Sequence, residues 1–276
     1  MSLSALGAHV SSGATLTGLA SADNGGYQAP TTQEFYQPLV GDGPFAVTRA
    51  CVVILLSVAL IAWFLLATTR KAAIVPSKGQ ALTESIYGFV RNGVARDIIG
   101  SHDFLRFVPM LFSMFILILV NNLFGIIPPI QFPTMGRIGF PIALTVIVYV
   151  IYHAIAIQKH GLVGYIKGLV PAGLPKAIVP VIFLLELITF FVTRPLTLAL
   201  RLFGNMFAGH LLLLLFITGG EYMLVHGSIG LKVAGVGSFV LAFVLTIFEG
   251  LIEFLQAYIF TLLAATYIAG ALADEH

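Results

Sequence analysis

Charged residues are scarce in this chain: Asp, Glu, Lys and Arg make up 9% of its 276 residues, whereas hydrophobic residues make up 58%. Soluble domains carry about 25% charged residues, so this composition predicts an integral membrane protein and excludes a soluble domain with one anchor. Only one cysteine is present, Cys51, which excludes an intramolecular disulfide. The near balance of 14 basic and 12 acidic residues gives no sign of nucleic-acid binding.

Several kinds of chemical site are also missing from the sequence. No cluster of His, Cys, Asp or Glu has the spacing of metal ligands, and no glycine-rich loop resembles a nucleotide-binding cradle. No nucleophile stands beside a candidate base, and no polar stretch is long enough for a soluble catalytic domain. We therefore expect no metal, no cofactor and no catalytic activity of the chain on its own.

Long apolar runs predict an all-α membrane protein with five membrane-entering helices and one amphipathic surface helix. A hydrocarbon core about 30 Å thick needs about 20 mainly apolar residues in a helix. The segments expected to enter the membrane are 45–69, 105–127, 141–157, 178–218 and 231–272. Residues 45–276 would form a single membrane domain.

Two segments outside these spans need separate interpretations. Residues 1–44 are rich in Gly, Ser, Ala and Thr and lack the basic start and apolar core of a signal peptide, so we expect a loosely ordered extracytoplasmic lead-in. Residues 79–100 carry apolar side chains at helical spacing with polar ones opposite, which predicts the amphipathic helix in the membrane surface. A short soluble helix packed on a partner is the alternative.

The basic residues of the short loops predict the orientation of the chain. They gather after the first span and after the third, and cytoplasmic loops are the ones that collect Lys and Arg. The N-terminus is therefore expected outside, and the C-terminus, after five membrane-entering segments, in the cytoplasm. The residues that decide this are Arg70, Lys71, Lys78, Arg91, Arg96, Lys159, Lys167 and Lys176.

The last two segments are unusually long for membrane spans. A helix of about 40 residues measures about 60 Å, which is twice the thickness of the hydrocarbon core. Each segment must therefore fold back or tilt steeply, and ordinary spans rarely tilt beyond about 40°. We expect a hairpin of two steeply tilted helices that presents a long apolar surface to a neighbour inside the membrane.

The first long segment contains a fixed positive charge. Apolar residues lie on both sides of Arg201, and an arginine in hydrocarbon costs from roughly 2.5 to more than 10 kcal/mol. A guanidinium cannot escape that cost by losing its proton. No acid lies within two turns on the same segment, so we expect Arg201 to meet an anion on another chain. Arg194 and Asn205 share its helix face, whereas His210 lies opposite.

The last segment carries a stripe of carboxyl and amide groups. Glu249, Glu253 and Gln256 stand at spacing i, i+4, i+7 and therefore lie on one helix face. Stacked carboxyl groups inside a membrane suit a hydrated proton path, because each neutral carboxyl can pass a proton to the next group or to water. The alternative is that Glu253 and Gln256 only form hydrogen bonds inside a helix bundle.

Three motifs of the chain are distinctive: Leu200–His210, which reads LRLFGNMFAGH, Leu255–Phe260, which reads LQAYIF, and Asn121–Pro128, which reads NNLFGIIP. With these motifs the chain resembles the a-subunit family of the bacterial F-type ATP synthase membrane sector. The similarity runs from about residue 45 to the end and includes the order of the segments.

The resemblance implies a role for each polar residue of the hairpin. Arg201 matches the essential arginine that faces the rotor ring of c subunits, and Asn205 and Gln256 match polar residues close to it. His210 and Glu249 match a pair in the half-channel that opens to the outside. Some members carry an acid at the first of these two positions and a histidine at the second, which suggests that His210 and Glu249 touch.

Other positions have a looser counterpart in the family. Glu186 resembles an acid near the cytoplasmic end of the fifth helix and would border the inner half-channel. Glu253 has no firm counterpart. Asn121 and Asn122 would either satisfy each other and nearby backbone or line the outer half-channel.

The resemblance also implies partners and a location. The partners would be the ring of c subunits, b-type stator subunits, the remaining ATP synthase subunits and membrane lipid. The location would be the bacterial plasma membrane.

One competing function remains open on the sequence alone. A self-contained secondary transporter or ion channel would use Arg201 to hold an anionic substrate at the midplane of the membrane. Such transporters usually show internal repeats and broken half-helices, and neither a repeat nor a proline in the last segment is present. A purely structural scaffold would leave Arg201 and the carboxyl stripe unexplained.

Overall fold

The computed structural model describes residues 27, 29–31, 38–40, 47–70, 73–127, 130–169, 175 and 178–273. Most of the predicted lead-in, 1–44, therefore lies outside the described residues. Tyr27 is an exception, and its hydroxyl donates a hydrogen bond to the backbone oxygen of Leu215, at 3.3 Å. The regular secondary structure of the described residues is helical, apart from one short antiparallel pair of strands, β1 (Pro38–Val40) and β2 (Val47–Thr48).

The predicted all-α membrane class is confirmed. The helices are α2 (Arg49–Thr69), α3 (Lys78–Val90), the π-helix η2 (Arg91–Arg96), α4 (Asp97–Ile99), α5 (Val108–Leu123), α6 (Gly139–Gly168), α7 (Val179–Ile188), the π-helix η5 (Thr189–Thr193), α8 (Arg194–His226) and α9 (Ile229–Leu272). Two short 3₁₀ turns are η3 (Phe104–Arg106) and η4 (Thr134–Gly136).

Four helical stretches in the described part of the chain are long and apolar enough to cross a membrane: α2, α6, the continuous helix from α7 to α8, and α9. The remaining predicted segment, 105–127, contains α5, which has 16 residues and is followed by turns. The segment predicted to end at residue 157 continues in α6, where Gly161 has a φ of +68° and breaks the helix. A positive φ is accessible to glycine because it has no Cβ.

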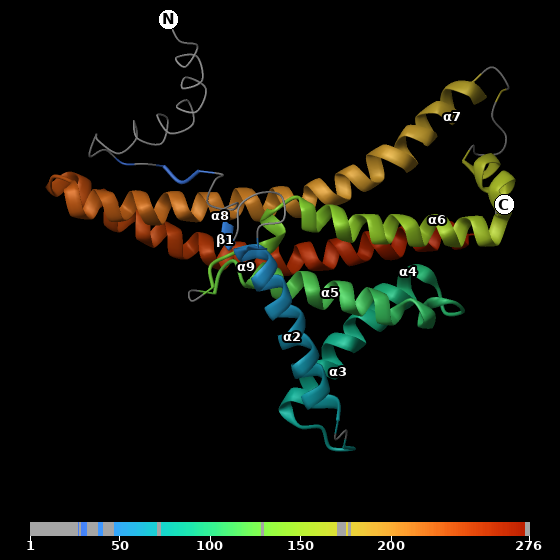
Figure 1. Cartoon of the computed structure of the whole chain (residues 1–276), viewed down its shortest axis with the longest axis horizontal. Coiled ribbons are helices and arrows are strands. Elements are labelled where there is room, and N and C mark those ends of the chain that lie inside the picture. The colour runs from blue at the N-terminus through green and yellow to red at the C-terminus, as the bar shows by residue number, and fades with distance from the viewer. Residues whose placement is uncertain are drawn as a thin grey trace, which may run out of the picture.

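A hairpin of two long helices dominates the molecule. The helix from Val179 to His226 has 48 residues and α9 has 44, and only Gly227 and Ser228 connect them. Figure 1 shows α8 and α9 running side by side in opposite directions, with α5 and α6 alongside and α2 crossing them. The chain thus stays helical to His226, whereas the sequence predicted an end at 218.

Close packing explains this longer hairpin. A Cβ added to Gly220 would lie 3.1 Å from the ring of Phe239, and one added to Gly235 would lie 3.0 Å from the backbone oxygen of Gly220. Small residues let two membrane helices approach closely. The contacts made there outweigh the low helix propensity of glycine.

Proline shapes the junction between α7 and α8. Within the π-helix the backbone N–H of Arg194 donates to the backbone oxygen of Thr189, five residues earlier. In this i→i−5 pattern the next bond would run from the backbone N–H of residue 195 to the backbone oxygen of Phe190. Pro195 has no N–H. The Tyr152 hydroxyl of α6 donates to the Phe190 oxygen instead, at 3.1 Å, and so ties α6 to the junction.

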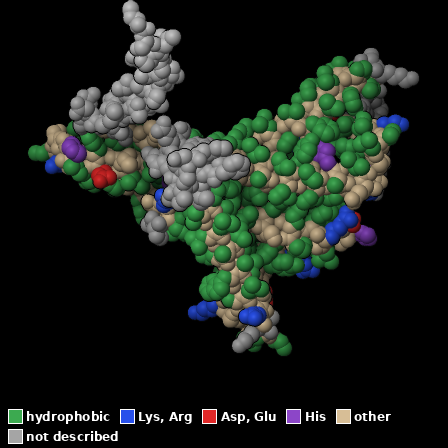
Figure 2. All heavy atoms as spheres, in the orientation of Figure 1, with side chains coloured by type: hydrophobic (Ala, Val, Ile, Leu, Met, Phe, Trp, Pro, Cys, Tyr) green, Lys and Arg blue, Asp and Glu red, His purple; other side chains and the backbone are tan. Residues whose placement is uncertain are grey.

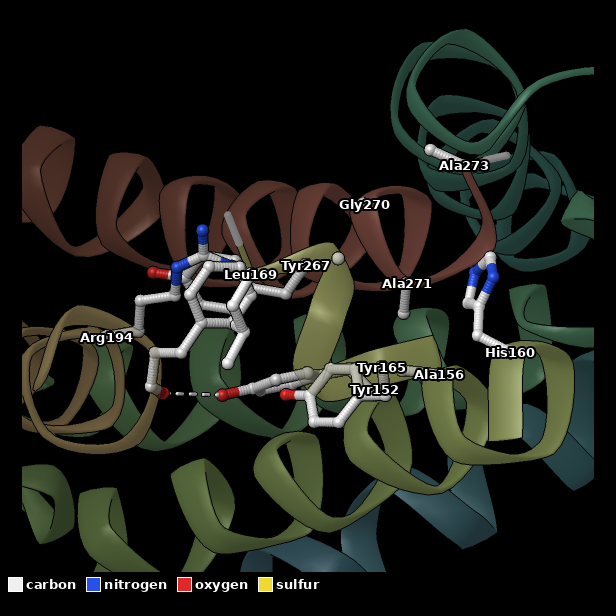
Figure 3. Close-up of a pocket in the computed structure, with 12 residues that line it drawn as sticks. Tyr152, Ala156, His160, Tyr165, Leu169, Arg194, Tyr267, Gly270, Ala271 and Ala273 are labelled. Atoms are coloured by element: carbon white, nitrogen blue, oxygen red, sulfur yellow. Dashed lines mark hydrogen bonds between the residues drawn. The ribbon is translucent and has the colours of Figure 1, made fainter. Parts of the chain in front are cut away.

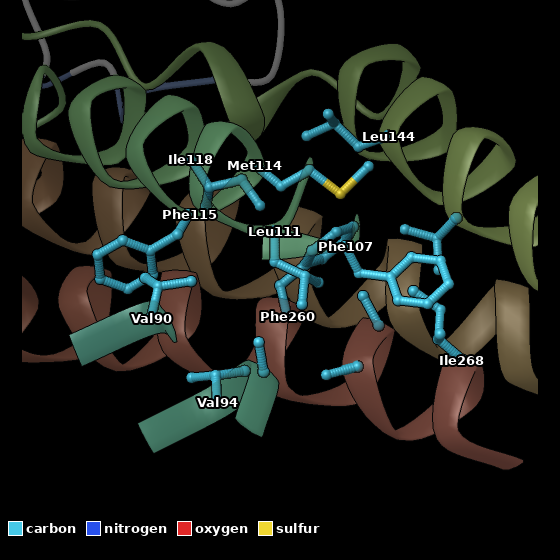
Figure 4. Close-up of a cluster of buried hydrophobic side chains, with 14 of the residues drawn as sticks. Val90, Val94, Phe107, Leu111, Met114, Phe115, Ile118, Leu144, Phe260 and Ile268 are labelled. Atoms are coloured by element: carbon cyan, nitrogen blue, oxygen red, sulfur yellow. The ribbon is translucent and has the colours of Figure 1, made fainter. Parts of the chain in front are cut away.

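The main hydrophobic core lies between α5 and the second half of α9. Figure 4 shows the side chains of Phe107, Leu111 and Phe115 meeting those of Phe260 and Ile268, with Val90 and Val94 closing one side. The helical stretch from α3 through α4 therefore packs on this chain's own helices through Val90 and Val94, although Leu82 and Phe89 stay exposed. Its placement in the membrane surface stays a prediction.

The outer surface of the bundle is mostly apolar. In Figure 2 hydrophobic side chains cover the visible face of the helices, and Lys and Arg side chains gather near the ends of the elements. Such a surface is typical of a protein surrounded by lipid and partner helices.

Candidate functional site

Arg201 points outward from the hairpin. Leu198, Leu202 and Met206 form a buried stripe on α8, and this stripe turns Arg201 and Asn205 to the exposed side. The ion pairs in the described part of the chain join Asp103 to His102 and to Arg106, so no described carboxylate lies within 4 Å of the Arg201 guanidinium. The fixed charge on α8 is thus not neutralised by a described acid of its own chain.

Asn205 connects this exposed face to the second helix of the hairpin. Its Nδ2 donates a hydrogen bond to Oε1 of Gln256 on α9, at 2.7 Å. Gln256 is buried, so its amide is held in one place next to the turn that carries Arg201. The structure therefore joins Gln256 of α9 to Asn205, which lies one helical turn after Arg201 on α8, and a joint role of the three residues stays a prediction.

Two carboxyl groups are buried on the same face of α9 as Gln256. Glu249 is 7% exposed and Glu253 is fully buried. In the described part of the chain, Oε2 of Glu249 and both carboxyl oxygens of Glu253 have no hydrogen-bond partner. Buried ionised carboxylates without partners are very costly, so these groups must be neutral or hydrated.

The Glu249 carboxyl packs against the backbone of α8 beside His210. A Cβ added to Gly209 would lie 2.8 Å from Oε1 of Glu249, so any larger residue at this position would displace the Glu249 carboxyl. His210 is buried and lines a cavity of about 150 Å³ together with Gly125, Gln131 and Thr246. A direct contact between His210 and Glu249 stays a prediction.

Residues 51–269 match the family described as the ATP synthase A chain. The ATP synthase subunit a of a Nocardioides species is 45% identical over 267 residues, which cover 92% of this chain and 96% of the relative. The subunit a of Pseudarthrobacter chlorophenolicus is 44% identical and that of Streptomyces lividans 40%, with 92% of this chain covered in each and 97% and 91% of the respective relatives.

The chain belongs to the ATP synthase A chain family. The match spans α2 through nearly all of α9, and it therefore includes every residue of the candidate site from Asn121 to Gln256. The family resemblance expected from the three motifs is confirmed.

The two adjacent asparagines turn to different partners. Asn121 donates to the Ser57 hydroxyl of α2 at 2.8 Å and accepts from the Thr134 hydroxyl at 2.7 Å. Asn122 donates to the backbone oxygen of Glu253 at 3.3 Å. Asn121 is therefore part of a satisfied network between α2, α5 and η4, whereas Asn122 reaches the carboxyl stripe of α9.

Glu186 stands apart from the other acids of this ATP synthase A chain family member. It is half-buried on α7, fifteen positions before Arg201, which corresponds to about 22 Å along a helix axis. The three acids of the predicted site therefore fall into two groups, Glu186 on one side of Arg201 along the hairpin and the Glu249–Glu253 pair on the other helix.

Sequence reasoning missed two glycines that make room for the carboxyl groups. A Cβ added to Gly125 would lie 3.1 Å from Oε1 of Glu253, just as one at Gly209 would crowd Glu249. Both glycines stand inside the family motifs, directly after Phe124 and directly before His210. That position was the only sequence signal, because the close approach depends on how α5, α8 and α9 pack.

Proposed function

We propose that the chain is the proton-conducting stator subunit of a rotary F-type ATP synthase. It supplies two offset half-channels and the arginine that faces the carboxylates of a c-subunit ring. The exposed guanidinium of Arg201, without a described acid of its own chain beside it, carries this proposal. A permanent cation on an apolar helix face requires an anion in the membrane, and a rotor carboxylate is that anion.

The exposed face around Arg201 is extensive enough to contact a large partner. The outward residues of α8 recur at helical spacing, and α9 exposes a parallel apolar row beside them. The α8 row is Arg201, Asn205, Ala208, Leu212 and Leu215, and the α9 row is Val244, Phe248, Leu251 and Leu255. Such a contiguous apolar surface with one cation suits a ring of apolar helices that each carry one carboxyl group.

The electrostatics of Arg201 explain how rotation and proton flow are coupled. A rotor carboxyl in lipid is stable when neutral and ionises only where a cation faces it. Arg201 attracts the carboxylate that has just lost its proton, and it blocks a direct leak because a guanidinium does not give up its own proton. A potential of 100 mV contributes about 2.3 kcal/mol for each proton that crosses.

The outer half-channel leads from the cavity at His210 to the exposed face of α8. Glu249 and Glu253 stand one helical turn apart on α9 and continue to Gln256, whose amide holds Asn205 beside Arg201. Carboxyl oxygens that lack partners among the described residues leave hydrogen-bonding sites for water along this row. Protons therefore pass from His210 and Glu249 through Glu253 to the rotor carboxyl.

The inner half-channel begins on the other side of Arg201, near Glu186. Its separation from the α9 carboxyls keeps the two half-channels offset, so a proton must travel with the rotor to get from one to the other. Asn122 borders the outer half-channel through its bond to the backbone of Glu253.

The hairpin lies steeply tilted in the membrane. A helix of 21 residues, such as α2, measures about 31 Å and fits the hydrocarbon core when it stands near the membrane normal. The α8–α9 hairpin crosses α2 in Figure 1 and is far longer than the core is thick. A steep tilt keeps it within the core and lays the Arg201 face along a rotor.

Within the assembly, the N-terminus faces the outside and the C-terminus the cytoplasm of a bacterial plasma membrane. The basic loops on the cytoplasmic side support this orientation. The other contacts of the chain are b-type stator subunits, the remaining ATP synthase subunits and lipid. Nucleotide chemistry takes place on those other subunits.

The competing function, a self-contained transporter or channel, receives less support. Such proteins place broken half-helices around a midplane site. Here α9 runs without a break through the level of the carboxyl stripe, and Arg201 faces outward instead of into a cavity between helices.

Cysteine crosslinking within the assembled synthase tests the docking face. With Cys51→Ser as background, Ala208→Cys on the Arg201 face is combined with a cysteine one turn from the rotor carboxyl. Leu55→Cys on the exposed side of α2 is the matched control. The proposal predicts a disulfide to the c subunit for position 208 and none for position 55. Equal crosslinking at both positions, or none at 208, overturns it.

A further inference from the structure

A second cavity lies between α6, η5 and the end of α9, and no residue of the proton path lines it. Its volume is about 150 Å³. Figure 3 shows Arg194 at one end of this cavity and His160 at the other, with the phenol rings of Tyr152 and Tyr165 between them. One water needs at least about 10–15 Å³ of such space, so the cavity has room for a phosphate group.

The charge of the cavity favours an anion. Arg194 and His160 are basic, and none of the described lining residues is acidic. No described carboxylate lies within 4 Å of the Arg194 guanidinium. Its guanidinium carbon lies 3.5 Å from the centre of the Phe190 ring and 5.4 Å from that of Tyr267. Stacking fixes the plane of a guanidinium and leaves its N–H edge for an oxyanion.

The hydroxyl groups add donors for the same ligand. The Tyr165 hydroxyl is buried, lines this cavity and has no hydrogen-bond partner among the described residues. The Tyr152 hydroxyl already donates a hydrogen bond to the backbone oxygen of Phe190, and this bond holds the Tyr152 ring in place at the wall of the cavity. A buried hydroxyl without a partner is costly, and a phosphate oxygen would accept its hydrogen bond.

The surroundings of the cavity point to a lipid as the source of the anion. Next to it, α7 and the end of α6 present exposed aliphatic side chains where acyl chains can lie. These are Val181, Leu184, Leu185 and Ile188 on α7 and Leu162 and Val163 on α6. We propose that the cavity lined by Arg194, Tyr165 and His160 binds the phosphate group of an anionic phospholipid. This proposal does not depend on the proposed half-channels.

Lipid retention by the whole synthase tests the proposal. The complex is stripped of lipid in detergent, incubated with phosphatidylglycerol or with phosphatidylcholine, and the bound lipid is counted by mass spectrometry. We expect about one retained phosphatidylglycerol per chain and preference over phosphatidylcholine. Arg194→Gln should weaken its binding at least about tenfold, because charge-assisted hydrogen bonds to a phosphate are lost.

Three further variants separate binding from folding. Arg194→Lys should restore part of the affinity, and Tyr165→Phe should weaken binding without removing charge. Arg106→Gln removes an exposed arginine outside the cavity and should change nothing. Retention that is equal in all variants, or equal for the two lipids, overturns the proposal. Arg194-dependent binding of inorganic phosphate without any phosphatidylglycerol supports the oxyanion site and overturns the lipid as its source.

Discussion

The Glu249 carboxyl lies directly against Gly209, so that a methyl group at position 209 would stand 2.8 Å from Oε1. This distance is below a van der Waals contact, and the atom that must move is the end of a flexible side chain. The backbone of the hairpin can therefore stay in place while the carboxyl is displaced.

Gly209→Ala is accordingly expected to affect proton flow more than folding. We predict normal assembly and at least about a tenfold loss of proton-driven ATP synthesis, since a displacement of about 1 Å in a reacting group can cost 100-fold. Gly237→Ala on α9 is the control, because nothing lies within 4 Å of a Cβ there. Membrane vesicles with a fixed proton gradient provide the measurement, and unchanged synthesis in Gly209→Ala would contradict a role for Glu249.

Glu253→Gln should separate function from stability. The substitution keeps the size of a fully buried side chain and removes its ability to take up a proton. We predict roughly a tenfold or greater fall in proton-driven synthesis, with a melting temperature of the complex that is unchanged or higher, because burying an acid is costly. A lower melting temperature with normal synthesis would instead assign Glu253 a structural role.

The relative importance of two α9 positions is also predicted. Glu249→Gln should impair passive proton flow through the membrane sector more than Gln256→Leu, because in the proposed path Glu249 carries protons whereas Gln256 only positions Asn205. The comparison uses vesicles stripped of the catalytic sector, with the decay of a proton gradient as the signal. A larger loss in Gln256→Leu would reverse these two roles.

The bond between Asn205 and Gln256 can be measured by a double-mutant cycle with Asn205→Ala and Gln256→Ala. Interhelical hydrogen bonds in membrane proteins contribute about 0.6 kcal/mol on average, so we expect a coupling free energy of that order. Denaturant unfolding of the reconstituted chain gives the four stabilities. Strictly additive effects would mean that the 2.7 Å contact contributes nothing.

Tyr152→Phe tests the junction between α7 and α8. The variant removes the hydroxyl that satisfies the Phe190 oxygen next to Pro195, and an unsatisfied buried carbonyl costs about 1–3 kcal/mol. We predict destabilisation within this range, measured by thermal unfolding of the complex. The nearby Tyr149→Phe serves as the comparison, and equal stability of the two variants would contradict the account of the junction.

Much of the hairpin site follows from helical periodicity. The spacing of Glu249, Glu253 and Gln256 correctly placed them on one buried face, and apolar neighbours at Leu198, Leu202 and Met206 turn Arg201 outward. Arg194 shows the limit of this reasoning. It shares the helix face of Arg201, yet it is half-buried over the Phe190 ring, because tertiary contacts at the junction decide its surroundings.

Contacts between distant segments could not be read from the pattern. Asn121 forms hydrogen bonds with Ser57 and Thr134, which lie on different elements. Nothing in the sequence indicates that these two residues, and not the neighbouring Asn122, are its partners. The length of α8 was underestimated for a similar reason. Gly219 and Gly220 suggest a break, but the fit of Gly220 against Phe239 keeps the helix intact.

In the proposed mechanism, Arg201 acts through a permanent charge that meets a rotor carboxylate. The most direct test is ATP synthesis driven by an imposed proton gradient in vesicles that carry Arg201→Ala, beside Arg106→Ala as the control for loss of an exposed arginine. The account predicts that the Arg201 variant assembles but makes no ATP, whereas the Arg106 variant works at the normal rate. Synthesis at the normal rate in the Arg201 variant would contradict it.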